Sequence, residues 1–100
     1  MNRPDNRNSM TPDLLEAFAR CVKRCGAEEG VRCVVVTGRG NCFCAGADFK
    51  GQLGARNQRD GEYQSPWEKS RYNVYGPFLS LLELRVPVVA AMNGHAVGGG

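Results

Sequence analysis

Two segments of this chain pass from a run of apolar residues directly into residues with little or no side chain. The first extends from Val34 to Asp48, and the second extends from Pro87 to Gly100. Short runs of β-branched residues predict strands, and small residues after a strand let backbone N–H groups approach a ligand closely. One N–H group from each segment would hold a single oxygen atom between them, which is the geometry of an oxyanion hole.

The rest of the pattern alternates between helix and strand. Thr11-Pro12-Asp13 is typical of a helix start, the apolar residues that follow recur at helical spacing, and Gly26 is predicted to end the helix. The runs Val31–Thr37 and Val88–Met92 predict strands that are buried on both faces. This alternation is typical of an α/β architecture with right-handed connections.

Between the two strands the sequence predicts a loop and a second helix. Residues Gly51–Gln64 are polar and without periodicity, and Ser65-Pro66-Trp67-Glu68 fits a capping box. The apolar stripe of this helix is predicted to consist of Tyr75, Phe78, Leu79 and Leu82, and the helix is predicted to end before Arg85-Val86-Pro87. Asn93-Gly94 is a turn signal.

Composition excludes several classes of function. The net charge is only +3 and the basic residues are scattered, which argues against a nucleic-acid partner. The five cysteines form no Cys-x-x-Cys pair and the chain has one histidine, His95, so no zinc site is expected. We expect an intracellular protein in a reducing compartment, with no membrane span. The sequence does not distinguish cytoplasm, mitochondrion and peroxisome.

Four ordered stretches carry a family resemblance. They are Asn2-Arg3-Pro4-Asp5-Asn6-Arg7-Asn8, Thr37-Gly38-Arg39-Gly40, Phe43-Cys44-Ala45-Gly46-Ala47-Asp48 and Pro87 to Gly100. Together they resemble the crotonase superfamily, the enoyl-CoA hydratase/isomerase group. The resemblance implies an α/β fold in which residues 1–100 form part of a crotonase-type ββα spiral. It also implies a fragment truncated at both ends, without the helical C-terminal part, whose parent assembles as a homotrimer or hexamer.

The resemblance also implies a substrate and a site. Members of this superfamily act on acyl-CoA thioesters, with coenzyme A as part of the substrate and no separate cofactor. By position, the oxyanion hole would be formed by the backbone N–H groups of Ala47 and Gly99. The substrate would also contact Ala45, Gly46, Asp48, Phe49 and Lys50, where Lys50 would pair with a phosphate of coenzyme A. Arg3 and Arg7 are weaker phosphate candidates, and His95 is not expected to be catalytic.

Several alternatives stay open at this point. The two glutamates that hydratases of the superfamily use fall beyond Gly100, and no glutamate of the chain has a sequence reason to replace them. The reaction within the superfamily is therefore undetermined, and a non-catalytic acyl-CoA-binding or assembly module is the alternative function. A nucleotide-binding turn is disfavoured because Phe43 occupies the third glycine position of a G-x-G-x-x-G pattern.

Overall fold

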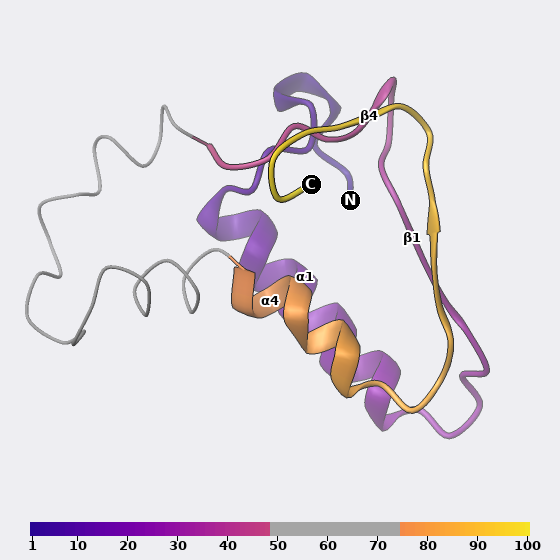
Figure 1. The fold of residues 1–100 in the computed structure, drawn as a ribbon. Helices are drawn as coiled ribbons and strands as arrows, with labels where there is room; N and C mark the ends of the chain where they lie inside the picture. The colour runs from indigo at the N-terminus through magenta and orange to yellow at the C-terminus, as the bar shows by residue number, and fades with distance from the viewer. Residues whose placement is uncertain (49–74) are drawn as a thin grey trace, which may run out of the picture.

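The computed structural model describes residues 1–48 and 75–100 (Figure 1). The predictions for Phe49, Lys50, Gly51–Gln64 and the Ser65–Glu68 capping box lie outside the described residues. In chain order the elements are η1 (Pro4–Asn6), α1 (Pro12–Ala27), β1 (Val34–Thr37), β2 (Cys42–Cys44), α4 (Gly76–Leu79), η3 (Ser80–Glu83), β3 (Val88–Ala91) and β4 (His95–Ala96).

Helix α1 begins where the sequence predicted. The Thr11 side-chain oxygen accepts a hydrogen bond from the Leu14 N–H at 3.3 Å, and Pro12 occupies the first turn. The predicted end at Gly26 is wrong, because the helix continues through that residue to Ala27. A Cβ atom at position 26 would lie 3.3 Å from Cδ2 of Leu84. Gly26 therefore gives room to a neighbouring side chain and does not cap the helix.

The strands form two small parallel sheets. In the first, β1 pairs with β3 in the register Val34↔Val88 through Thr37↔Ala91. In the second, β2 pairs with β4 in the register Cys42↔His95 and Cys44↔Ala96, with an irregularity between these two pairs. The parallel pairing confirms the α/β class. Sequence periodicity did not predict β2 and β4, since strands of three and two residues are too short to show it.

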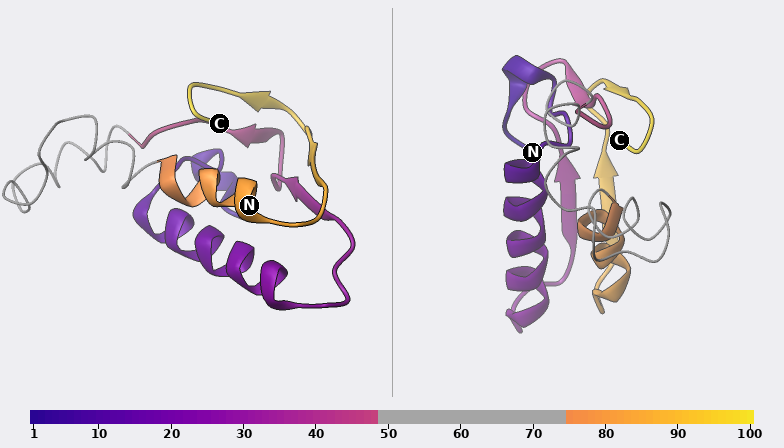
Figure 2. Two further views of the ribbon diagram at one scale, coloured as in Figure 1. Left: turned by 60° about the horizontal axis from the view of Figure 1, so that its bottom comes forward. Right: turned by 90° about the vertical axis from the view of Figure 1, so that its left-hand side faces the viewer.

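The prediction that β1 and β3 are buried on both faces is wrong for this chain. Val35 is 60% exposed and Val89 is 50% exposed. Helix α1 runs alongside the strands (Figure 2), but a cavity of about 600 Å³ lined by residues of α1 and β1 separates them. Within the described residues, strands this apolar consequently keep much of their side-chain surface open to solvent.

The second helical segment is only partly as predicted. Phe78 packs on Phe18 of α1 with ring centroids 4.5 Å apart, and the segment ends at Glu83, before Arg85, as predicted. The rest of the predicted apolar stripe is wrong in its burial, because Tyr75 is 41%, Leu79 44% and Leu82 83% exposed. The last turn is a 3-10 helix with about 3.0 residues per turn, so residue 82 rotates away from the face that Phe78 occupies.

The core lies at the N-terminal end of α1. Its buried members are Met10, Leu15, Phe43 and Cys44, and Val36, Ala47 and Phe78 pack against them. The core therefore connects α1 to the end of β2. In the part of the chain that the structure describes, no helix has the length and apolar character needed to cross a membrane.

Candidate functional site

The pairing of β2 with β4 brings the two small-residue segments together. Beyond the strands, the Val97 N–H donates to the Cys44 carbonyl at 3.0 Å. A Cβ atom at Gly46 would lie 2.5 Å from the Val97 carbonyl oxygen, and one at Gly100 would overlap the Cys44 backbone. Residues 45–48 therefore lie against residues 97–100 at a distance that only glycine permits at these two positions.

Met10 lies under both segments and connects Ala47 with Gly99. It forms an isolated parallel bridge with Ala47, in which its N–H donates to the Gly46 carbonyl at 2.8 Å. A Cβ atom at Gly99 would lie 3.0 Å from the Met10 Cε atom and would overlap the Tyr75 ring. The two residues predicted to form the oxyanion hole are thus neighbours of the same buried methionine.

The orientation of the Ala47 N–H follows from the planar peptide. The Gly46 carbonyl and the Ala47 N–H belong to one trans peptide and point in opposite directions. Since the Gly46 carbonyl points at Met10, the Ala47 N–H points away from it. Among the turn and loop backbone hydrogen bonds of residues 1–48 and 75–100, neither the Ala47 N–H nor the Gly99 N–H is a donor. Both groups are consistent with donors to a ligand.

Two cysteines lie beneath this region. Cys42 and Cys44 are buried, and the Cys42 thiol donates to the His95 carbonyl at 3.2 Å. Burial raises the pKa of the Cys44 thiol, and the neighbouring Cys42 raises it further, although a hydrogen bond from the Gly46 backbone acts in the opposite direction. A buried thiol of this kind stays protonated and acts as a small apolar core residue.

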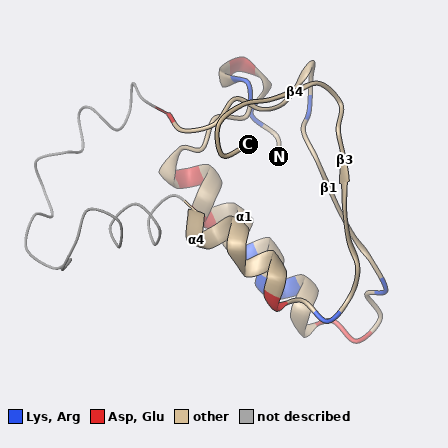
Figure 3. Cartoon of the chain, viewed as in Figure 1, with Lys and Arg blue, Asp and Glu red and all other residues tan. Residues whose placement is uncertain are grey.

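The structure gives the charged candidates different surroundings. Arg3 pairs with Asp13 at 3.3 Å and donates to the Thr11 hydroxyl at 3.2 Å, so it already has partners at the start of α1. Arg7 is exposed, and its carbonyl accepts from the Ala45 N–H at 3.0 Å. Figure 3 marks acidic positions on η1, along α1, in the loop after α1, at the end of η3 and just before residue 49, and none on β4. Asp48 is the acidic residue of the described chain nearest in sequence to Ala47.

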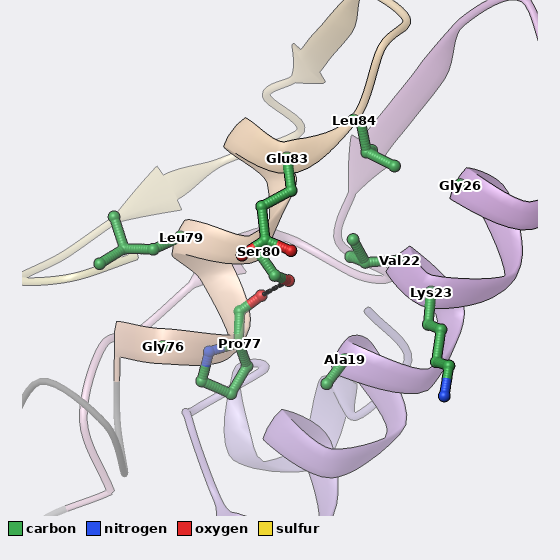
Figure 4. Close-up of a pocket in the computed structure, with 10 residues that line it drawn as sticks. All are labelled: Ala19, Val22, Lys23, Gly26, Gly76, Pro77, Leu79, Ser80, Glu83 and Leu84. Atoms are coloured by element: carbon green, nitrogen blue, oxygen red, sulfur yellow. Dashed lines mark hydrogen bonds between the residues drawn. The ribbon is translucent and has the colours of Figure 1, made fainter.

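A separate groove of about 930 Å³ lies between α1 and the α4–η3 segment (Figure 4). Lys23 and Glu83 line it, and the Ser80 hydroxyl inside it donates to the Pro77 carbonyl at 2.6 Å. None of the residues predicted to contact a substrate lines this groove. It is therefore a feature of the helical layer and not part of the candidate site.

The sequence interpretation missed three residues that build the site. Met10 directly precedes the N-cap Thr11, and it shares the core with Leu15, which is the spacing of a hydrophobic staple. That signal was available in the sequence. Asn8 and Asn93 hold the turn between β1 and β2 through their side-chain amides. Asn93 had been interpreted only as a turn residue.

Comparison with known proteins gives a consistent family. The family model described as enoyl-CoA hydratase/isomerase matches residues 1–100. The chain is 36% identical to the probable enoyl-CoA hydratase EchA14 of Mycobacterium tuberculosis, over all of this chain and 36% of that protein. It is 33% identical to the 1,2-epoxyphenylacetyl-CoA isomerase of Escherichia coli, over all of this chain and 37% of that protein.

Solved structures agree. An enoyl-CoA hydratase/isomerase from Marinobacter aquaeolei matches with a TM-score of 0.83 and 32% identity, over 100% of this chain and 38% of that one. An enoyl-CoA hydratase from Bacillus anthracis matches with a TM-score of 0.78 and 31% identity, over 98% of this chain and 36% of that one. The chain thus spans little more than a third of the length of these relatives. Because the family model matches the whole sequence, the chain belongs to the enoyl-CoA hydratase/isomerase family, in the crotonase superfamily.

Proposed function

We propose that this chain forms the oxyanion-hole portion of a protein that binds acyl-CoA thioesters and stabilises the enolate formed from them. The observation that supports this most directly is the contact of residues 45–48 with residues 97–100 over Met10. That contact places two small-residue backbone segments at one location, one contributing Ala47 and the other Gly99. The names of the relatives, which include an enoyl-CoA hydratase and an acyl-CoA isomerase, are consistent with a thioester substrate.

The chemistry follows from what a thioester requires. Removing a proton next to the carbonyl, or adding a nucleophile to a conjugated double bond, places negative charge on the carbonyl oxygen. Two fixed N–H donors stabilise that charge more than they stabilise the neutral carbonyl, and one donor of this kind is typically worth about 3 kcal/mol. Ala47 and Gly99 take this role in the proposal. In the same proposal, which for these residues rests on the family resemblance, Ala45, Gly46 and Asp48 contact coenzyme A together with Phe49 and Lys50, two residues outside the described ranges, and Lys50 would pair with a phosphate.

Proton transfer needs further groups. Glu16 is paired with Arg20 on the exposed side of α1, and Glu83 lines the separate groove. Since a general acid or base must reach the substrate within hydrogen-bond distance, neither is suited to that task. We therefore propose that, among the residues that the structure describes, the chain supplies binding and charge stabilisation, and that neither Glu16 nor Glu83 acts as the acid or base. The same observation favours the second candidate function, a non-catalytic acyl-CoA-binding or assembly module.

The test measures polarisation of a bound thioester. A saturated acyl-CoA labelled at the thioester carbonyl carbon is titrated into the purified protein, and the carbonyl resonance is followed by NMR. An oxyanion hole shifts this resonance downfield in the bound state, because its donors draw electron density towards the oxygen. Binding without any shift would refute the assignment of an oxyanion hole, and no binding at millimolar ligand would refute the acyl-CoA site.

A matched pair of variants identifies the donor. Ala47→Pro removes the backbone N–H, whereas Ala47→Ser keeps it and adds only a hydroxyl. We expect the carbonyl shift to be lost in Ala47→Pro and retained in Ala47→Ser, with both variants folded as judged by their amide spectra. Equal shifts in the two variants would show that Ala47 is not a donor. Addition of crotonyl-CoA tests the proposal that the described glutamates do not transfer protons, since hydration requires an acid and a base as well as the hole; hydration by the purified protein would refute that part of the proposal. From the family resemblance we also propose that the parent protein assembles as a homotrimer or hexamer, which light scattering tests.

A further inference from the structure

The turn that joins β1 to β2 is held from one side by Asn93, which lies between β3 and β4. The Asn93 Oδ1 atom accepts a hydrogen bond from the Gly38 N–H at 3.0 Å. Its Nδ2 group donates to the Gly40 carbonyl at 2.7 Å and lies 3.4 Å from the Cys42 carbonyl. One side chain thus replaces several backbone hydrogen bonds that the turn does not make for itself.

Asn8 holds the same turn from the other side. Its Nδ2 group donates to the Cys42 carbonyl at 2.8 Å and to the Arg39 carbonyl at 3.1 Å, while its Oδ1 atom accepts from the Arg3 N–H at 2.8 Å. The residue is fully buried and has a φ angle of 54°, in the left-handed region that asparagine tolerates better than most residues. A left-handed backbone conformation at a buried polar residue indicates that its side-chain hydrogen bonds offset the cost of that conformation.

The turn is packed tightly between the two amides. A Cβ atom at Gly38 would lie 2.6 Å from the carbonyl oxygens of Cys42 and Phe43 and 2.8 Å from the Asn8 Nδ2 atom. No side chain therefore fits at position 38 on the side that faces Asn8 and the Cys42 and Phe43 carbonyls. We call the two side-chain amides of Asn8 and Asn93, which hold the turn 38–42 between them, the asparagine clamp.

Each part of the clamp continues into a part of the candidate site. Asn8 precedes Met10, which bridges Ala47, and Asn93 precedes β4 and the segment that contains Gly99. Cys42, whose carbonyl approaches both amides, begins the strand that leads to Ala47. The three segments that meet at the site are thus fastened to one another at a single carbonyl group.

We propose that Asn8 and Asn93 are positioning residues, which set the location of the Ala47 N–H relative to the Gly99 N–H. This inference rests on the proposed function, because it concerns the same pair of donors. The amides do not touch the thioester and act only through the backbone they hold. A misplacement of about 1 Å at such a site can cost about a hundredfold in rate, so small changes in the clamp have measurable effects.

The experiment uses variants that change one atom group without changing size. Asn93→Asp and Asn8→Asp each replace the donating Nδ2 group by an oxygen, which then faces carbonyl oxygens instead of donating to them. Asn41→Asp is the control, since it adds the same charge to the same turn at an exposed residue. Carbonyl shift at saturation and the Kd of the labelled acyl-CoA are measured for all four proteins.

We expect the Asn8 and Asn93 variants to bind acyl-CoA but to lose most of the carbonyl shift, while Asn41→Asp matches the wild type. A purely structural role would lower thermal stability and leave the shift of the folded fraction unchanged, and that result would overturn the inference. Absence of the shift in the wild-type protein would instead refute the proposed function. The two failures are therefore distinguishable.

A measurement on the wild-type protein covers variants that do not fold. The clamp requires the Gly38 N–H to be protected by Asn93, although it lies in a turn. We expect its hydrogen exchange to be as slow as that of the Val34 N–H, which donates to the Pro87 carbonyl at 2.9 Å. Exchange of Gly38 at the rate of an unstructured amide would show that no rigid clamp exists and would overturn the inference.

Discussion

Replacing Gly46 by alanine tests how closely the two segments of the site must approach. Gly46 has a φ angle of +82°, where an L-residue costs about 1–2 kcal/mol. Its new Cβ atom would lie 2.5 Å from the Val97 carbonyl oxygen and 3.3 Å from the Val97 carbonyl carbon. Relieving that overlap requires a shift of backbone, for which overpacking typically costs about 1–3 kcal/mol. We therefore expect Gly46→Ala to lower the free energy of unfolding by about 2–5 kcal/mol.

Two other glycines separate these contributions. Gly98 has a φ angle of +59° and nothing within 4 Å of its virtual Cβ atom, so Gly98→Ala carries the backbone cost alone. Gly30→Ala carries neither cost, because its Cβ atom would also meet nothing within 4 Å and its φ angle is ordinary. Urea denaturation of the three variants and the wild type gives the differences. We expect Gly30→Ala to be the most stable of the three variants, Gly98→Ala to be less stable and Gly46→Ala to be the least stable.

The same variant has an effect at the site. Moving Val97 away from Gly46 also moves the segment that carries Gly99, so Gly46→Ala is expected to weaken the thioester carbonyl shift, whereas Gly30→Ala is not. A Gly46→Ala protein as stable as Gly98→Ala would show that Val97 does not lie against Gly46. The packing argument for the site would then be refuted.

The remaining predictions concern the residues around the site. Cys44 should alkylate much more slowly than exposed Cys21, because Cys44 is fully buried and that burial also raises the pKa of its thiol and so lowers its thiolate fraction; mass spectrometry of iodoacetamide-treated native protein measures this, and equal rates would contradict it. Met10→Ala should lower the free energy of unfolding by about 2–5 kcal/mol, since the side chain is 1% exposed in the core. If the loss were no larger than the loss caused by replacing an exposed methionine with alanine, Met10 would not be a core residue. Thr11→Ala should cost about 1 kcal/mol through loss of the N-cap, with Thr11→Ser as the variant that retains most of it; equal stability of the two would mean that the cap contributes nothing.

Local signals predicted the parts of the fold that local interactions determine. The start of α1 followed from Thr11 and Pro12. Strands β1 and β3 lie within the predicted runs Val31–Thr37 and Val88–Met92, although β1 begins only at Val34 and β3 ends at Ala91. The predictions failed where the outcome depended on what packs nearby. Helix α1 continues through Gly26, whose missing side chain leaves room for Leu84, and the exposure of Val35 depends on how little of the sheet the described elements cover.

The same distinction applies to the site. Ala47 and Gly99 could be named from the sequence because the small-residue pattern, together with the family resemblance, marks backbone that can approach a ligand. Their arrangement could not be derived, because it depends on β2 and β4, which have no periodicity of their own. The roles of Asn8 and Asn93 were also not predictable, since their partners are as many as 34 and 55 residues away in the chain.

The long separation between paired strands has a consequence for the order of folding. The contact between Thr37 and Ala91 spans 54 residues and that between Cys42 and His95 spans 53, whereas α1 depends on neighbours within one turn. Loop-closure entropy must be overcome before such pairs form, so a chain of this topology makes its helix early and its strand pairs late. During synthesis from the N-terminus, Ala47 leaves the ribosome well before Gly99. The second N–H donor of the proposed oxyanion hole is therefore absent until the segment after β4 has been made. The binding site is therefore among the last features of this chain to form.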